Sequence, residues 1–184
     1  MTALTRRGAL LGGTAGLLAA CGGGVNSGGR DRIDQRVTSA VGTMQSEFPF
    51  TSALMERAAG MLVIPLVTKA GFIVGGAYGE GSLLIGQAPV DYYSVAAASY
   101  GLQAGAAQYS SVLFFMDSEH LAKFRGRPGW TLGADIEYTV LDDAGAAGID
   151  TNSIDEEVYA LVFGQAGILL GVSIEGSKYS RIVR

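Results

Sequence analysis

The amino-acid sequence predicts a single α+β domain in which helices precede a strongly coiled, glycine-rich, mainly antiparallel β-sheet or barrel-like body. Residues 31–60 space their apolar side chains three and four positions apart, as a helix does. Residues 61–175 instead form short apolar runs broken by Gly, Pro or Asp, as strands do. Glycine is frequent, at 28 of 184 residues, and glycines inside strands mark bulges and bends. The content of 48% hydrophobic residues is enough for a packed core.

The first twenty residues have the layout of an export signal. Two arginines form a basic start, Gly8–Ala20 is apolar, and small residues precede Cys21. The apolar run is too short to span a membrane as a helix, which takes about 20 residues. Residues 5–10 (TRRGAL) resemble a twin-arginine signal. Because Ala9 stands where that signal has an aromatic residue, general secretory export stays an alternative.

The end of this segment, Leu18-Ala19-Ala20-Cys21, resembles a bacterial lipobox. The resemblance implies cleavage before Cys21, a diacylglyceryl group on its thiol and an acyl group on its new amino terminus. Gly22 in place of Asp implies the outer membrane, with the domain facing the periplasm. We therefore expect a signal peptide over 1–20, a lipidated Cys and flexible tether over 21–30, and a folded domain over 31–184. The alternatives are an ordinary cleaved signal with an incidental Cys and a buried N-terminal helix.

Two helices are expected at the start of the folded domain. The first covers 31–47, and Pro49 ends it at about Glu47. The second begins at Thr51 or Ser52, either of which can cap it, and ends near Gly60. Core packing is the expected use of the apolar stripe on the first helix, which consists of Ile33, Val37, Val41, Met44 and Phe48. The alternative is an amphipathic helix that binds a partner or lies on a membrane surface.

Short strands and one further helix are expected after residue 60. Pro65 indicates an edge or a bulge, and residues 164–167 (GQAG) are typical of a hairpin turn. A short helix is expected over Asp117–Phe124. The predicted strands are Met61–Val67, Phe72–Ala77, Ser82–Gln87, Tyr92–Ser99, Leu102–Gln108, Ser111–Met116, Trp130–Leu141, Glu157–Phe163 and Gly167–Glu175.

The sequence offers little for catalysis. One cysteine and one histidine exclude an internal disulfide and a structural zinc site, and we expect no metal, no cofactor and no catalytic residue. Residues 171–176 (GVSIEG) resemble a nucleophile elbow with one residue too many, so Ser173 is the candidate nucleophile of a competing hydrolase hypothesis. His120 is expected to be an ordinary helical histidine. The acidic residues between Asp142 and Glu157 are expected to form a solvated loop, although an acidic pair there is a second hydrolase candidate.

One basic cluster, Lys123-Phe124-Arg125-Gly126-Arg127-Pro128-Gly129-Trp130, is a candidate lipid-binding segment. Its cations can engage phosphates, and Trp130 can lie at the level of a membrane interface. The alternative is a basic surface loop with Trp130 in the core. If the fold has a concave site, Lys69 and Lys178 are further candidates to line it.

From about Leu54 to the end, the order of motifs resembles the SYLF domain family. The motifs are Ala59–Pro65 (AGMLVIP), Lys69–Gly76 (KAGFIVGG), Gly79–Gly81, Gly101–Gln108 and Gly171–Ser177 (GVSIEGS). The family is also labelled an actin-binding domain family, and its eukaryotic members are similar to lipid- and phosphoinositide-binding modules. Its bacterial members are commonly lipoproteins. The first helix departs from the basic amphipathic helix of eukaryotic members, because its arginines alternate with acidic residues.

We therefore expect a membrane-anchored bacterial lipoprotein whose SYLF-like domain binds lipid or another cell-envelope component without catalysis. A purely structural envelope protein is the remaining alternative to the hydrolase. Loss of the signal with its two arginines takes the net charge from −4 to −6, so bulk charge favours neither nucleic acid nor anionic lipid. The expected partners are the membrane, through the anchor, and anionic lipid headgroups, through a local basic surface. Actin is not expected as a partner, because the compartment that the signal implies contains none.

Overall fold

The computed structural model describes residues 28–141, 156–167 and 174–184, and it confirms the α+β class with helices ahead of a curled, mainly antiparallel sheet. The sheet order is β3-β6-β2-β5-β4, and β1 pairs with β2. Neighbouring strands are antiparallel except for β4 and β5. The elements are α1 (Gly29–Glu47), α2 (Thr51–Arg57), β1 (Gly60–Ile85), β2 (Ala88–Phe115), α3 (Ser118–Gly126), β3 (Gly129–Thr131), β4 (Thr139–Leu141), β5 (Val158–Gly167) and β6 (Lys178–Ile182).

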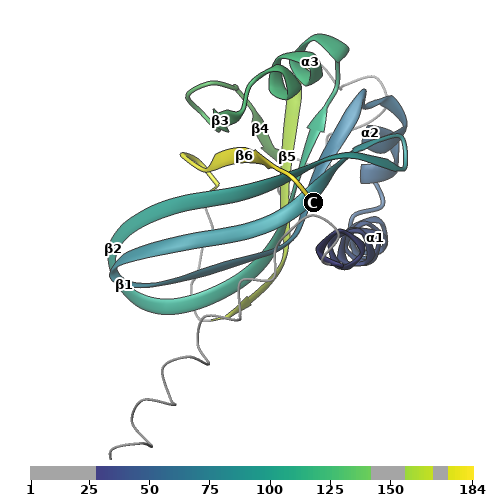
Figure 1. Ribbon diagram of the computed structural model, residues 1–184. Helices are drawn as coiled ribbons and strands as arrows, with labels where there is room; N and C mark the ends of the chain where they lie inside the picture. The colour runs from purple at the N-terminus through teal and green to yellow at the C-terminus, as the bar shows by residue number, and fades with distance from the viewer. Residues whose placement is uncertain (1–27, 142–155, 168–173) are drawn as a thin grey trace, which may run out of the picture.

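The centre of the fold is one long hairpin that curls back on itself (Figure 1). The six short strands expected between residues 61 and 116 are two continuous strands, β1 and β2, paired antiparallel along their length. β1 bends where its register shifts, between Gly71 and Ile73. A Cβ atom on Gly71 would lie 2.3 Å from the Cα atom of Gly75, a contact that no side chain permits. Glycine is therefore required for this bend.

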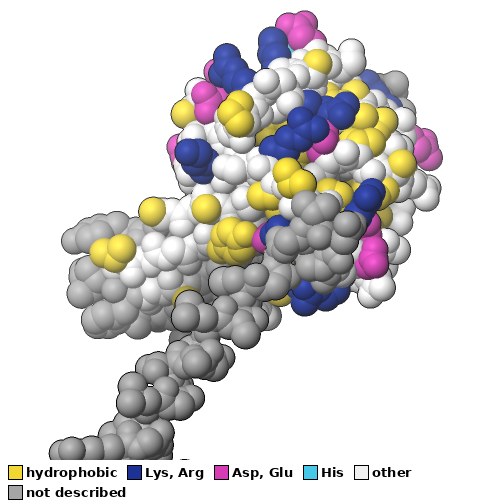
Figure 2. Space-filling model, in the orientation of Figure 1, with side chains coloured by type: hydrophobic (Ala, Val, Ile, Leu, Met, Phe, Trp, Pro, Cys, Tyr) yellow, Lys and Arg dark blue, Asp and Glu magenta, His cyan; other side chains and the backbone are white. Residues whose placement is uncertain are grey.

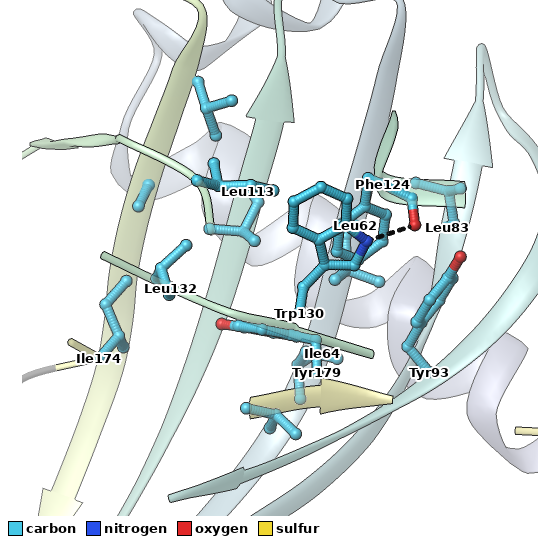
Figure 3. Packing of buried hydrophobic residues seen from close by; sticks show 14 of the residues in the cluster. Leu62, Ile64, Leu83, Tyr93, Leu113, Phe124, Trp130, Leu132, Ile174 and Tyr179 are labelled. Carbon is cyan, nitrogen blue, oxygen red and sulfur yellow. Dashed lines mark hydrogen bonds between the residues drawn. The ribbon is translucent and has the colours of Figure 1, made fainter. Parts of the chain in front are cut away.

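The curl brings the second half of β1 against its first half. A Cβ atom on Gly81 would lie 1.9 Å from the carbonyl oxygen of Val63, so the two backbones touch. The inside of the curl is filled by a cluster of buried side chains, part of which Figure 3 shows. Phe124 of α3 is fully buried in that cluster, with its ring centroid 4.8 Å from that of Tyr93 and 4.9 Å from that of Phe115.

α1 covers the outer face of the sheet. Ile33, Val37 and Met44, three members of the predicted stripe, are buried there. They belong to a second apolar cluster that includes residues of β1, β2 and β5. α1 ends at Glu47, as Pro49 predicts. It begins at Gly29, so the last two residues of the expected tether are helical instead.

Three expectations about the later elements are wrong. The segment 164–167 is not a hairpin turn: it lies within β5, where Gly164 adopts a φ of 61° beside a register shift. This register shift is a β-bulge, and the bulge needs a left-handed backbone conformation that glycine adopts without strain. Residues 130–141 form two short strands, β3 and β4, in place of one. The sequence does not predict β6, because three of its five residues, Lys178, Ser180 and Arg181, are polar and form no apolar run.

The bulge predicted at Pro65 is confirmed, since the register shifts between Ile64 and Val67. Ser110 Oγ donates a hydrogen bond of 2.8 Å to the carbonyl oxygen of Pro65 and so satisfies the freed acceptor. Within the described residues, no helix is both long enough and apolar enough to cross a membrane.

Candidate functional site

The predicted basic cluster lies at the end of the molecule that carries α3, where lysines and arginines are interspersed with acidic side chains (Figures 1 and 2). Asp117 is the N-cap of α3, because its carboxylate accepts hydrogen bonds of 2.8 Å from the backbone N–H groups of Glu119 and His120. Lys123 and Arg125 stand in the last turn, where the helix dipole favours cations. The chain then turns back through β3, which pairs with β6.

Arg125 is engaged in a buried ion pair. Its Nε atom donates to Asp91 Oδ2 at 2.8 Å, and Arg181 of β6 binds the other carboxylate oxygen. The Asp91 side chain is only 6% exposed, against 38% for Arg125 and 48% for Arg181. A buried carboxylate needs such cations to be stable in its charged form. The pair of arginines therefore ties α3 and β6 to β2.

Trp130 is a core residue, with 4% of its surface exposed. Its Nε1–H donates a 2.7 Å hydrogen bond to the carbonyl oxygen of Phe124, and this bond connects β3 to α3 (Figure 3). The indole stacks on the Phe124 ring at 6.1 Å, and the guanidinium of Arg127 covers it at 5.0 Å from the ring centroid. Trp130 is thus buried and anchors the basic loop from the core. This is the alternative interpretation of the cluster, a basic surface loop with Trp130 in the core.

The remaining cations of the predicted set are surface residues. Lys123 pairs with Glu119 at 2.8 Å in an exposed contact one turn away. Arg127 is 65% exposed, with Asp135 at 4.0 Å. Lys178 of β6 is exposed and lies opposite Thr131 of β3, next to the basic loop. Lys69 is not brought to this end, because it lies in β1 two residues before the glycine bend.

His120 joins α3 to β5. Its Nδ1 atom lies 2.8 Å from Asp117 Oδ2, and its Nε2 atom lies 2.9 Å from Glu157 Oε2. Both ring nitrogens thus face carboxylates of the fold, so the geometry favours a structural role for His120 as a link between the start of α3 and Glu157. Burial opposes ionisation of Asp117, but the hydrogen bonds from His120 and Glu119 outweigh it and lower the pKa of Asp117.

Two hollows flank α1, and sequence reasoning found neither. The larger, about 540 Å³, is an open groove between α1 and the bulges of β1 and β5, with Arg36, Pro65 and Gly164 in its wall. The smaller, about 340 Å³, lies between α1, α2 and the β1–β2 turn. None of the predicted site residues that the structure describes lines either hollow. No signal in the sequence could have shown them, because both arise where α1 docks on the sheet.

Several sequence-predicted residues lie outside the described ranges. They are Cys21, Ser173 and the acidic residues from Asp142 to Asp155. The lipidation and the hydrolase hypotheses that depend on them stay predictions.

Residues 96–182 match a family model, Ysc84, described as "Las17-binding protein actin regulator". The matched segment runs from the middle of β2 to the end of β6 and therefore includes α3, β3 and the cations around them. No curated protein matches the chain.

Proposed function

Because the chain belongs to the SYLF (Ysc84) family, matched over residues 96–182, we propose that it is a non-catalytic binding module held at a membrane by lipid on Cys21. The family supports a lipid-binding or actin-binding-like domain. Las17 binding and actin regulation are what the family description names. Because the first twenty residues have the layout expected of an export signal, we propose anionic lipid headgroups of the cell envelope as the ligand in place of actin.

The observation that supports this ligand is the placement of Arg127 and Lys178. Both are exposed, and they come from elements far apart in the sequence: the β3–β6 pairing brings Lys178 Cε to 3.6 Å from a Cβ atom built on Gly129, two residues after Arg127. Lys123 adds a third cation from the exposed side of α3, half-exposed and held by one surface contact with Glu119. Each basic residue near an anionic surface contributes about 1 kcal/mol, so three that contact the bilayer at once would raise affinity about 100-fold or more.

Arg125 is excluded from this contact surface, because it serves the buried Asp91. Reversing its charge would place a carboxylate beside another buried carboxylate and unfold the end of the molecule. A loss of lipid binding in such a variant would therefore say nothing about lipid. The informative substitutions are Arg127→Glu and Lys178→Glu, both at exposed side chains.

The headgroup contact is tested by flotation with phosphatidylglycerol-containing vesicles. The full chain carrying Cys21→Ser is used, so that binding does not depend on an anchor. The double variant Arg127→Glu/Lys178→Glu is expected to lose binding at low salt. The matched control is Arg32→Glu, which reverses an exposed arginine on α1, and it should bind as the parent does. Equal binding by the double variant and the control would contradict the proposal.

The anchor is tested by intact-mass spectrometry of the protein isolated from its native membrane. The expected mass corresponds to a chain that begins at Cys21 and carries acyl groups. A chain with an unmodified Cys21 would contradict the anchoring part of the proposal and leave the headgroup contact standing.

A further inference from the structure

The smaller hollow has the construction of a binding site for an apolar chain. Its floor is made by buried apolar side chains, chiefly Val37, Met61 and Leu84, with Met55 of α2 at one side. Its rim is polar and uncharged over most of its length. The volume of about 340 Å³ lies in the range of small-molecule sites and holds roughly eleven groups of the size of water or methylene.

A buried hydroxyl in the wall of this hollow has no partner. Ser82 is fully buried, and its Oγ atom forms no hydrogen bond within the part of the chain that the structure describes. Leaving a buried hydroxyl unsatisfied is costly, and such groups are rare in folded proteins. Ser82 lies opposite Tyr92 on β2, whose hydroxyl donates to Asp34 and accepts from Arg30 and makes no bond to Ser82. Because the Oγ atom has no exposed surface in this structure, a ligand carbonyl oxygen would accept from Ser82 once the side chains beside it move apart.

The mouth of the hollow is kept open by a glycine in the middle of α1. Gly42 lines the hollow, and a Cβ atom built there would meet no atom within 4 Å. The fold therefore has no steric need for glycine at this position. Glycine in a helix interior is destabilising relative to alanine, so its presence calls for another reason. The reason that the geometry offers is access, because a larger side chain at Gly42 would cover the hollow.

The charges around the hollow select an uncharged head. No lysine or arginine is among the described residues that line it, and Asp34 is its one charged wall residue. The Asp34 carboxylate already accepts from Tyr92 at 2.9 Å. A carboxylate or phosphate placed here would meet Asp34 and no cation among the described lining residues, since the nearby Arg30 is engaged with Tyr92 outside the lining. Thr38, Gln45 and Gln87 on the rim suit hydroxyl and amide groups.

We propose that this hollow binds an uncharged acyl compound, with a chain of about ten carbon atoms on the floor, its ester or amide carbonyl at Ser82, and a neutral polar head at the rim. The site goes beyond the proposed headgroup contact, because it uses α1, α2 and the β1–β2 turn in place of α3, β3 and β6. It gives the domain a second ligand of a different class.

The test is calorimetric titration of the full chain carrying Cys21→Ser with 1-decanoylglycerol below its micellar concentration. The parent is expected to bind one molecule saturably. Gly42→Leu should weaken binding at least tenfold, because its side chain fills the mouth. Gly42→Ala is the matched control and should bind within about twofold of the parent. Both changes remove a helical glycine, so both should raise the melting temperature, which excludes unfolding as the cause.

Two further arms fix the chemistry of the site. Ser82→Ala should weaken binding about threefold to tenfold without lowering the melting temperature, since it removes an unsatisfied hydroxyl. Decanoate, the anion with the same chain length, should bind at least tenfold more weakly than 1-decanoylglycerol.

The proposal is overturned by an absence of saturable binding, by Gly42→Leu binding as tightly as Gly42→Ala, or by equal binding of decanoate. Gly42→Leu should leave vesicle flotation unchanged, and Arg127→Glu/Lys178→Glu should leave the titration unchanged. The two sites can therefore fail separately.

Discussion

The buried Asp91 makes Arg125 a structural residue, and replacing it by methionine should destabilise the domain. Met keeps the apolar stem and removes the guanidinium that donates to Asp91 at 2.8 Å. A hydrogen bond between charged groups contributes about 1.5–3 kcal/mol, and the 38% exposure of Arg125 together with the remaining Arg181 argues for the lower part of that range. We expect a loss of about 2 kcal/mol, which lowers the melting temperature by roughly 4–8 °C for a domain of this size.

The assay is thermal and urea unfolding of four chains: the parent, Arg125→Met, Arg181→Met and the double variant. The double variant leaves Asp91 buried without a cation, so it should lose more than the sum of the single variants. Lys123→Met is the control, because its pair with Glu119 is exposed on both sides and its loss should change stability little. The reasoning is refuted if Arg125→Met is as mild as Lys123→Met, or if the double variant is additive.

Further predictions concern the curl and the start of α3. Gly81→Ala should destabilise the domain by about 3 kcal/mol or more in urea unfolding, because its Cβ atom would lie 1.9 Å from the Val63 oxygen. Gly76→Ala is the control and should change stability little, because the atom nearest to its Cβ would lie 3.8 Å away. Asp117→Ala should cost about 1 kcal/mol through the lost helix cap. Because the folded-state pKa of Asp117 is lowered, its contribution is present above about pH 4 and is lost as the pH falls through that pKa; Asp117→Asn should therefore reduce the acid sensitivity seen in a pH series of melting curves.

The sequence predicts the positions of the helices well because their signals are local. The cap expected at Thr51 or Ser52 is wrong, because Phe50 precedes α2 without a side-chain cap bond and Thr51 Oγ1 donates to the carbonyl oxygen of Phe48. The stripe on α1 needs only the spacing of apolar residues, and Pro49 ends the helix through its own geometry. Asp117 likewise caps α3 through hydrogen bonds to residues two and three positions ahead. Such features follow from neighbours in the chain.

The strand boundaries were harder, because the same glycine signal has two meanings. The glycines near residues 71–76 and 101–105 are equally typical of turns between short strands and of bends inside a long one. The choice depends on what packs across the bend. The contact between Gly81 and Val63, which lie 18 positions apart in the sequence, favours a bend inside one long strand. No local sequence pattern contains that contact.

The roles of the basic residues could be listed from the sequence but not assigned. Lys123, Arg125 and Arg127 look alike as a cluster. Arg125 differs only because Asp91, 34 positions earlier, is buried beside it. Lys178 joins the same surface through the pairing of β6 with β3, a strand pair that the sequence did not reveal.

The salt dependence of vesicle binding tests the central claim most directly. Binding of the Cys21→Ser chain to phosphatidylglycerol-containing vesicles is measured from 0.05 to about 0.3 M salt, where the Debye length falls to a few ångströms. A contact made by Lys123, Arg127 and Lys178 predicts binding that falls steeply over this range and is absent on purely phosphatidylcholine vesicles. Binding that is independent of salt, or equal on both kinds of vesicle, would contradict the account.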